Sequence, residues 1–197
     1  TFGAAPSNGG NEGASSKGTF NFGNTATGSS STTTGGFSLA ALKNGANEVH
    51  SLDSSKKAIE LTDNNILLND LADKHTSIVA DAMVYIRETG EDFDIVILDP
   101  PSFAQNQASI LRALSSYERL ARLGLRLTAP GGTLLQASCS SRVNIDELAD
   151  AAYLAARTAQ VDIDEFKRTE HAVDHPIGFE FGAYLKAIYY KVTPYDI

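Results

Sequence analysis

The chain has 197 residues and a formal net charge of -8, and its length suffices for one domain with a full hydrophobic core and a short appendage. The negative charge argues against tight, non-specific nucleic-acid binding by this chain alone, because an acidic surface repels phosphate. The single cysteine, Cys139, excludes an intramolecular disulfide and a multi-cysteine zinc site.

Residues 1–33 differ in kind from the rest of the chain. They consist mostly of Gly, Ser, Thr, Asn and Ala, with Glu12 and Lys17 as the only charged residues. Such a segment buries too little apolar surface to offset its conformational entropy, so we expect a disordered, low-complexity tail. The pairs Phe2-Gly3 and Phe22-Gly23 are similar to nucleoporin Phe-Gly repeats, although a linker or fusion scar is the commoner origin of such a tail.

Beyond this tail, helical and extended patterns alternate. The predicted helices cover residues 36–45, 54–71, 82–90, a stretch within 107–128, and 144–158. The predicted strands cover residues 47–53, 76–81, 93–99, 133–140, about 161–169 and about 184–192. Ser54 or Ser55 can cap the second helix, and residues 130–132 predict a turn. The alternation predicts an α/β fold, a doubly wound and mostly parallel sheet with helices on both faces.

Open α/β sheets bind ligands at the carboxyl ends of their strands, so those positions carry the candidate site. Gly35-Gly36 opens the first helix, where backbone N–H groups and the helix dipole can face a ligand, although an ordinary tight turn also fits. Asp53 ends the first predicted strand, where an acid can accept hydrogen bonds from ribose hydroxyls. Asp53 and Asp81, which ends the next strand, could instead cap the helices that follow them.

The sequence DPPSF, residues 99–103, follows a strand that is apolar throughout. Pro100 and Pro101 stiffen the backbone, which can hold Asp99 and Phe103 around a planar group. A carboxylate can hydrogen-bond the edge of a base while an aromatic ring stacks on its face. The alternative is a proline-rich loop with a buried phenylalanine.

Cys139 lies near the end of the strand predicted over residues 133–140, which should border the same cleft as DPPSF. Most lone cysteines are small core residues. At this position a thiolate could attack C6 of a pyrimidine and make C5 nucleophilic enough to accept a methyl group. Covalent catalysis of this kind needs a depressed thiol pKa or a nearby base.

Together these motifs resemble one family. From Thr34 to the C-terminus the chain is similar to the catalytic domain of class I S-adenosylmethionine-dependent ribosomal RNA methyltransferases, and within it to the large-subunit cytosine-C5 type. The resemblance therefore implies a Rossmann-like methyltransferase fold over residues 34–197. The matching stretches, in the expected order, are TGGFSLAALKNGA, SLDSS, NNILLN, FDIVILDPPSF, GGTLLQASCS, DHP and YLK.

The resemblance implies S-adenosylmethionine as the cofactor and ribosomal RNA as the substrate, with no metal. Residues 34–37 would lie near the methionine part of the cofactor, Asp53 would bind its ribose, and Asp81 would lie near its adenine. The residues implied to contact the cofactor are Thr34, Gly35, Gly36, Phe37, Asp53, Asp81 and Asp99.

The resemblance also implies a catalytic pair, in which Asp99 would face both the cofactor and the target base and Cys139 would be the nucleophile. His175 and Lys186 match recurring motif positions without an assigned role. The residues implied to contact the base are Pro100, Pro101 and Phe103.

Two features depart from the family pattern. The first strand is normally an apolar run with an acidic or amide residue and aromatics, leading directly into Thr-Gly-Gly, whereas residues 29–33 read SSSTT. We therefore expect residues 34–197 to lack a first strand, and the central slot between the strands that end in Asp53 and Asp99 to be empty or filled at a cost. The stretches that resemble the family do not include its upstream RNA-binding domain, so we expect the RNA affinity of this chain to be weak.

The expected function is thus methyl transfer to cytosine C5 of ribosomal RNA, impaired by the missing strand. A guanine-specific ribosomal RNA methyltransferase of the same fold would not need the thiol. A catalytically impaired α/β module with a flexible protein-binding tail is the third interpretation. Since no apolar run approaches the roughly 18 to 20 residues that span a membrane, and the N-terminal residues show no secretory signal, we expect a cytoplasmic protein.

Overall fold

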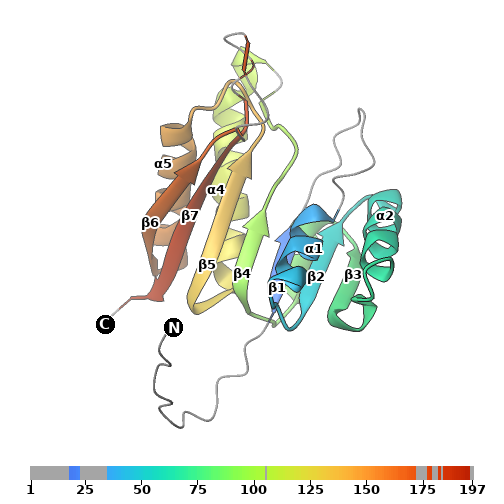
Figure 1. The fold of residues 1–197 in the computed structure, drawn as a ribbon. Helices are drawn as coiled ribbons and strands as arrows, with labels where there is room; N and C mark the ends of the chain where they lie inside the picture. The colour runs from blue at the N-terminus through green and yellow to red at the C-terminus, as the bar shows by residue number, and fades with distance from the viewer. Residues whose placement is uncertain are drawn as a thin grey trace, which may run out of the picture.

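The computed structural model describes residues 18–22 (20–22 as backbone only), 35–104, 106–171, 177–178, 182 and 184–195. These residues form a seven-stranded sheet of order β3-β2-β1-β4-β5-β7-β6 (Figure 1). The strands β1 to β5 run parallel, and β7 runs antiparallel to its two neighbours. The predicted α/β fold, with a mostly parallel sheet and helices on both faces, is confirmed.

All the predicted helices and strands are present. The strands are β1 Thr19–Phe22, β2 Val49–Asp53, β3 His75–Val79, β4 Phe93–Leu98, β5 Thr128–Ser138, β6 Val161–Thr169 and β7 Lys186–Pro194. The helices are α1 Gly36–Lys43, α2 Lys56–Leu67, α3 Ala82–Glu88, α4 Ile110–Leu127 and α5 Ile145–Ala159, with 3-10 turns at Ala72–Lys74 and Gln107–Ser109. Residues 130–132, predicted as a turn, form a bulge within β5: Gly131 has φ +77°, and the pairing with β4 passes from Thr128 opposite Phe93 to Thr133 opposite Ile95.

Strand β1 fills the central slot of the sheet, so the expectation of a missing first strand is wrong. Its ladders begin at Thr19, which lies between Val49 of β2 and Ile95 of β4, and they end at Phe22. A disordered tail over the whole of residues 1–33 is therefore contradicted at these four residues. The SSSTT stretch lies outside the described residues.

The sequence of β1, TFNF, matches the family pattern that residues 29–33 lack, an amide between aromatic residues. Thr and Phe favour extended backbone, but four residues give a weak local signal, and pairing with two neighbouring strands supplies the rest. The approach of β1 to β2 also needs glycine at position 18. A Cβ on Gly18 would lie 2.4 Å from the carbonyl oxygen of Glu48.

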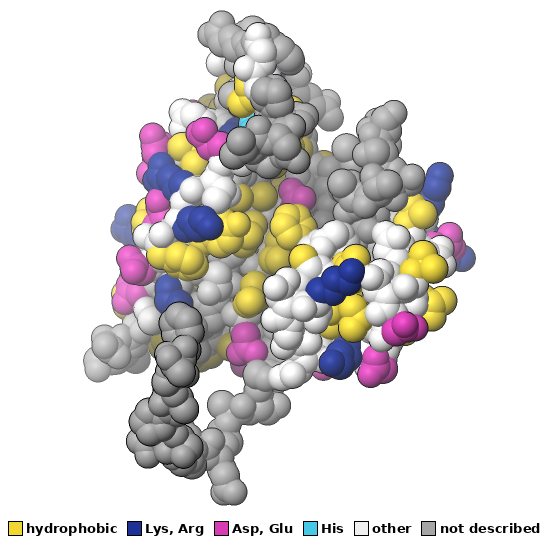
Figure 2. Space-filling view, in the orientation of Figure 1, with side chains coloured by type: hydrophobic (Ala, Val, Ile, Leu, Met, Phe, Trp, Pro, Cys, Tyr) yellow, Lys and Arg dark blue, Asp and Glu magenta, His cyan; other side chains and the backbone are white. Residues whose placement is uncertain are grey.

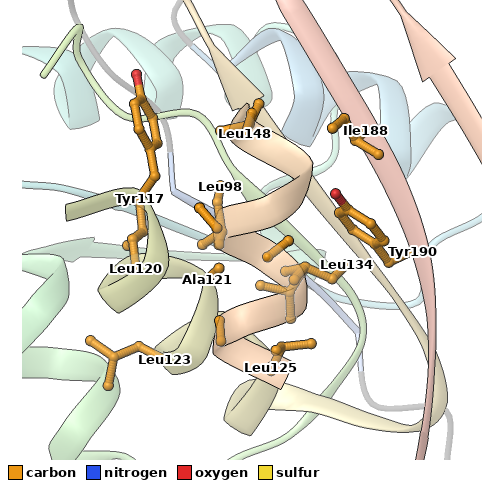
Figure 3. Close-up of a cluster of buried hydrophobic side chains, with 14 of the residues drawn as sticks. Leu98, Tyr117, Leu120, Ala121, Leu123, Leu125, Leu134, Leu148, Ile188 and Tyr190 are labelled. Atoms are coloured by element: carbon orange, nitrogen blue, oxygen red, sulfur yellow. The ribbon is translucent and has the colours of Figure 1, made fainter. Parts of the chain in front are cut away.

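Hydrophobic clusters lie on both faces of the sheet and hold the strand ends in place. The largest packs α3, α4 and α5 against β4, β5 and β7, and Figure 3 shows part of it, including Leu98, Tyr117, Leu134 and Tyr190. A second cluster joins α1, β2 and α2 through Leu42, Val49 and Ile66.

A third, smaller cluster lies on the face of β4 and β5 opposite to α4, because side chains alternate between the two faces of a strand. It consists of Ile97, Leu135 and Ala137, with Ala187 and Tyr189 packed against it. Figure 2 shows hydrophobic side chains on this face over the middle of the sheet. Of the helices described, none is both long and apolar enough to cross a membrane.

Candidate active site

The parallel strands place most of the predicted site residues along one edge of the sheet. Asp53 is the last residue of β2, Asp99 directly follows β4, and Cys139 directly follows β5. Because β2, β1, β4 and β5 are parallel neighbours, their carboxyl ends lie side by side, at the upper edge of the sheet in Figure 1. Asp81 follows β3 at the same edge, one strand farther out.

The glycine pair at the start of α1 has the backbone that a phosphate- or cofactor-binding turn requires. Gly35 has φ +79°, and a Cβ there would lie 2.6 Å from Cγ2 of Thr62, so only glycine fits without strain. Among the described residues, a Cβ on Gly36 would meet nothing within 4 Å, so they leave room for a ligand on this side. Gly35, at the N-cap position, has no side chain to cap the helix, so the first N–H groups of α1 can serve that ligand. Phe37, in the same turn, is 45% exposed, and Thr34 lies outside the described residues.

Asp53 is 9% exposed, and its Oδ1 accepts a hydrogen bond of 2.7 Å from the backbone N–H of Ser55. Burial raises the pKa of this carboxyl, and the backbone hydrogen bond lowers it in part. The cap of α2 is Ser55, whose Oγ accepts from the N–H of Ala58, so Asp53 is not needed for that task. The other carboxylate oxygen can accept hydrogen bonds from ribose hydroxyls.

We expect Asp53→Ala to weaken the binding of S-adenosylmethionine by about ten- to a hundredfold. A hydrogen bond to a charged acceptor contributes about 1.5 to 3 kcal/mol, and about 1.4 kcal/mol corresponds to one decade of affinity. Titration calorimetry measures the change, with Asp73→Ala, an exposed aspartate in the turn before β3, as the control. Equal affinities of the parent chain and Asp53→Ala would leave Asp53 with a structural role only.

Asp81 caps α3, since its Oδ1 accepts a hydrogen bond of 3.0 Å from the N–H of Val84. The alternative role that the sequence left open is therefore present in the structure. Its side chain is exposed and has a second oxygen, so a contact with adenine stays a prediction.

The DPPSF loop is ordered around a buried proline. Pro100 is buried, Pro101 is exposed, and Phe103 is half-buried, with its ring edge-on to that of Tyr117 at 4.9 Å between centroids. Phe103 thus packs against the large cluster, as the alternative interpretation of a buried phenylalanine requires. Contacts of Pro100, Pro101 and Phe103 with a target base stay predictions.

Asp99 is the most perturbed carboxylate at this edge. Burial raises its pKa from 3.8 to about 6. The structure brings it close to Cys139, because β4 and β5 are paired up to Leu98 and Gln136. Two ionisable groups with raised pKa values at the carboxyl edge of a parallel sheet are a frequent sign of a functional site.

Asp99→Asn should increase the free energy of unfolding at pH 7.5 by about 1 to 3 kcal/mol. A pKa raised from 3.8 to about 6 means that the folded chain binds this proton more tightly than the unfolded chain, so stability falls as pH rises between these values. Two pKa units correspond to about 3 kcal/mol, and residual solvent contact reduces this. Urea unfolding at pH 7.5 and pH 4 measures the effect, which should nearly vanish at pH 4. A pH-independent difference would show that burial of the charge is not its cause.

Cys139 is half-buried, and its Sγ lies 3.9 Å from the carbonyl oxygen of Pro100, so the strand end and the DPPSF loop meet as predicted. Burial raises the pKa of the thiol, and the neighbouring Asp99 raises it further. Backbone N–H contacts and the positive charge of Lys186 lower it in part. The thiol therefore needs assistance to ionise near neutral pH.

Two residues near the thiol, Tyr117 and Lys186, have no function that the sequence pattern assigns. The hydroxyl of Tyr117, on α4, lies 2.8 Å from Oγ of Ser138, which precedes Cys139. Nothing in the sequence distinguishes Tyr117 from other core residues of an amphipathic helix. The motif position of Lys186 carries no assigned role in the sequence, and a lysine at the start of an apolar strand is the signal that points to it. His175 lies outside the described residues. In the described part of the chain, no group of three or more His, Cys, Asp or Glu side chains is arranged to hold a metal.

Comparison with known proteins places this geometry in a family. The family model of S-adenosylmethionine-dependent methyltransferases matches residues 27–191. A ribosomal RNA large subunit methyltransferase of Deinococcus radiodurans is 39% identical over 162 residues, 80% of this chain and 40% of that protein. Ribosomal RNA large subunit methyltransferase I of Aeromonas salmonicida is 39% identical over 165 residues, 79% of this chain and 41% of that protein. The chain thus spans about two fifths of the length of these relatives.

Solved structures share the fold. SMU.776, crystallised with SAH, has a TM-score of 0.71 at 24% identity, over 90% of this chain and 46% of that one. TYW2 of P. horikoshii, in complex with MeSAdo, has a TM-score of 0.63 at 11% identity, over 93% of this chain and 60% of that one. Since the family model covers residues 27–191, from before α1 into β7, the chain belongs to the S-adenosylmethionine-dependent methyltransferases.

Proposed function

We propose that this chain carries the catalytic centre of an RNA methyltransferase that methylates C5 of a cytosine in large-subunit ribosomal RNA, with Cys139 as the nucleophile. The observation that carries the proposal is the meeting of Cys139 with the DPPSF loop, where Sγ lies 3.9 Å from the carbonyl oxygen of Pro100. The relatives, named as ribosomal RNA large subunit methyltransferases, support the substrate class.

The cofactor would be held by the turn at Gly35-Gly36 and by Asp53. The positive φ of Gly35, the open side of Gly36 and the buried carboxylate of Asp53 all fit a ligand with ribose hydroxyls. When bound, S-adenosylmethionine supplies an electrophilic methyl group. Asp99 and Asp81 lie at the same edge and would complete the cofactor contacts.

In the proposed reaction the thiolate first attacks the ring and is released from it at the end. Cys139 Sγ forms a bond to C6 of cytosine, and the electron pair of the C5–C6 double bond moves to C5. C5 would then accept the methyl group that S-adenosylmethionine, held by the Gly35-Gly36 turn and Asp53, would supply, and the electron pair of the broken bond would leave with the cofactor. Removal of the C5 proton by a base returns an electron pair to the ring, which restores the double bond and expels the thiolate.

The RNA affinity of the chain alone should be low. Its net charge of -8 opposes phosphate contacts, and the relatives are more than twice as long as the segment they share with it. Basic contacts from outside this segment would then supply most of the affinity.

A guanine-specific methyltransferase is the second candidate, and the raised pKa of the Cys139 thiol favours it. A thiol that stays protonated near neutral pH is a poor nucleophile, and a guanine enzyme would not need one. The idea of an impaired module rested on an empty central slot, and β1 occupies that slot.

Identification of the methylated nucleoside tests the proposal. The chain is incubated with unmodified large-subunit ribosomal RNA and S-adenosylmethionine carrying a labelled methyl group, and the RNA is digested to nucleosides. Labelled 5-methylcytidine supports the proposal, and labelled methylguanosine supports the second candidate. If calorimetry detects cofactor binding but no nucleoside is labelled even at high concentrations of chain and RNA, the proposed activity of this chain is wrong.

A further inference from the structure

Lys186 is a buried cation beside the candidate nucleophile. It is the first residue of β7, it is 6% exposed, and it lies opposite Ser138 in the antiparallel ladder with β5. Residues opposite one another in such a ladder place their side chains on the same face. Ser138 directs its Oγ to Tyr117 of α4, so Lys186 extends beneath the loop that begins with Cys139.

The ammonium group of Lys186 holds that loop through two backbone carbonyls. Nζ donates a hydrogen bond to the oxygen of Ser140 and another, of 2.5 Å, to the oxygen of Val143. The same loop is tightened by a bond from Ser140 N–H to Ser138 Oγ and one from Arg142 N–H to Ser140 Oγ. A charged donor to two carbonyls fixes the start and the end of the turn.

The charges around the thiol come from several elements. Asp99, after β4, disfavours the thiolate, and Lys186, on β7, favours it. Tyr117, from α4, is held neutral, because burial raises the pKa of its hydroxyl. Burial lowers the pKa of Lys186, whereas Cys139, Glu147 of α5 and Glu170 after β6 raise it. Among these groups, only Lys186 can neutralise a thiolate at Cys139.

We propose that Lys186 is a positioning residue for Cys139, which holds the nucleophile's loop through the carbonyls of Ser140 and Val143 and stabilises the thiolate with its charge. This inference rests on the proposed role of Cys139. Burial disfavours the charged form of a lysine, and a neighbouring anion that the charge stabilises offsets this cost. Charge-preserving substitutions should therefore be tolerated better than those that preserve only the hydrogen bonds.

Alkylation of Cys139 tests the inference without any methyl transfer, because this thiol is the only one in the chain. Lys186→Gln keeps N–H donors for the loop but removes the charge, whereas Lys186→Arg keeps the charge. With iodoacetamide at pH 8, the alkylation rate of Cys139 should be about three- to tenfold lower in Lys186→Gln than in the parent. The pH at which alkylation reaches half of its maximal rate should be higher by about one unit or more. Lys186→Arg should stay near the parent rate.

Lys191→Met is the matched control, since it removes an exposed lysine from the same strand. Circular dichroism checks that each variant is folded at each pH. If Lys186→Gln does not fold, the uncharged variant Lys186→Met takes its place. Equal alkylation rates in folded Lys186→Met and in Lys186→Arg, which keeps the charge, would then refute the charge effect. Parent-like alkylation in folded Lys186→Gln overturns the inference.

The kinetics of methyl transfer give a second readout. Lys186→Gln should lower kcat and leave KM for the cofactor unchanged, because among the described residues Lys186 donates hydrogen bonds to Ser140 and Val143 and not to the Gly35-Gly36 turn or Asp53. If Cys139→Ser retains activity, the proposed function fails, yet the alkylation result still reports whether Lys186 acts on the thiol. The two failures are thus separate.

Discussion

A chain shortened to begin at residue 23 should lose cooperative unfolding, whereas one that begins at residue 18 should unfold like the parent. The first truncation removes β1 from between β2 and β4. Inner strands then have backbone N–H and C=O groups without partners, and each such buried group costs about 1 to 3 kcal/mol. Several of them equal the roughly 5 to 15 kcal/mol that holds a domain of this kind together.

A point substitution tests the same strand without shortening the chain. Gly18→Ala places a Cβ 2.4 Å from the carbonyl oxygen of Glu48, a backbone atom that cannot move without shifting β2. Gly90→Ala is the control, because a Cβ there meets nothing within 4 Å. We expect Gly18→Ala to destabilise the sheet at β1, and urea unfolding and amide hydrogen exchange of residues 19–22 measure this loss of stability. Rapid exchange of these amides in the parent chain would show that β1 is not part of the stable sheet.

Cys139→Ser should reduce methyl transfer by about a thousandfold or more while leaving cofactor affinity within a few-fold of the parent. A hydroxyl is nearly the same size as a thiol but is far less acidic, so the site keeps its shape and loses its nucleophile. The large effect follows because the thiolate is required to activate C5, whereas the Gly35-Gly36 turn and Asp53 belong to other strand ends.

Single-turnover assays with ribosomal RNA measure the transfer step, and calorimetry measures cofactor binding. Ser141→Ala, two residues farther along and exposed, controls for disturbance of the loop. Undiminished turnover in Cys139→Ser, with the same methylated nucleoside, would assign Cys139 a packing role and favour the guanine-specific candidate.

Local sequence patterns alone determined the fold class and the order of the elements. Alternating helix and strand signals predicted the α/β fold, and the residues at strand ends, Asp53, Asp99 and Cys139, lie along one edge as expected. These inferences succeeded because a parallel sheet brings the carboxyl ends of its strands together whatever the intervening loops.

Only the tertiary structure revealed the first strand, the bulge in β5 and the role open to Lys186. The four residues TFNF form a strand because β2 and β4, far away in sequence, pair with both of their edges. Residues 130–132 look locally like a turn, and Gly131 has φ +77°, but the chain continues as one strand because Thr128 and Thr133 on either side both pair with β4. The pKa values of Asp99 and Cys139 and the carbonyl contacts of Lys186 likewise depend on burial and on neighbours from other strands, which no local pattern records.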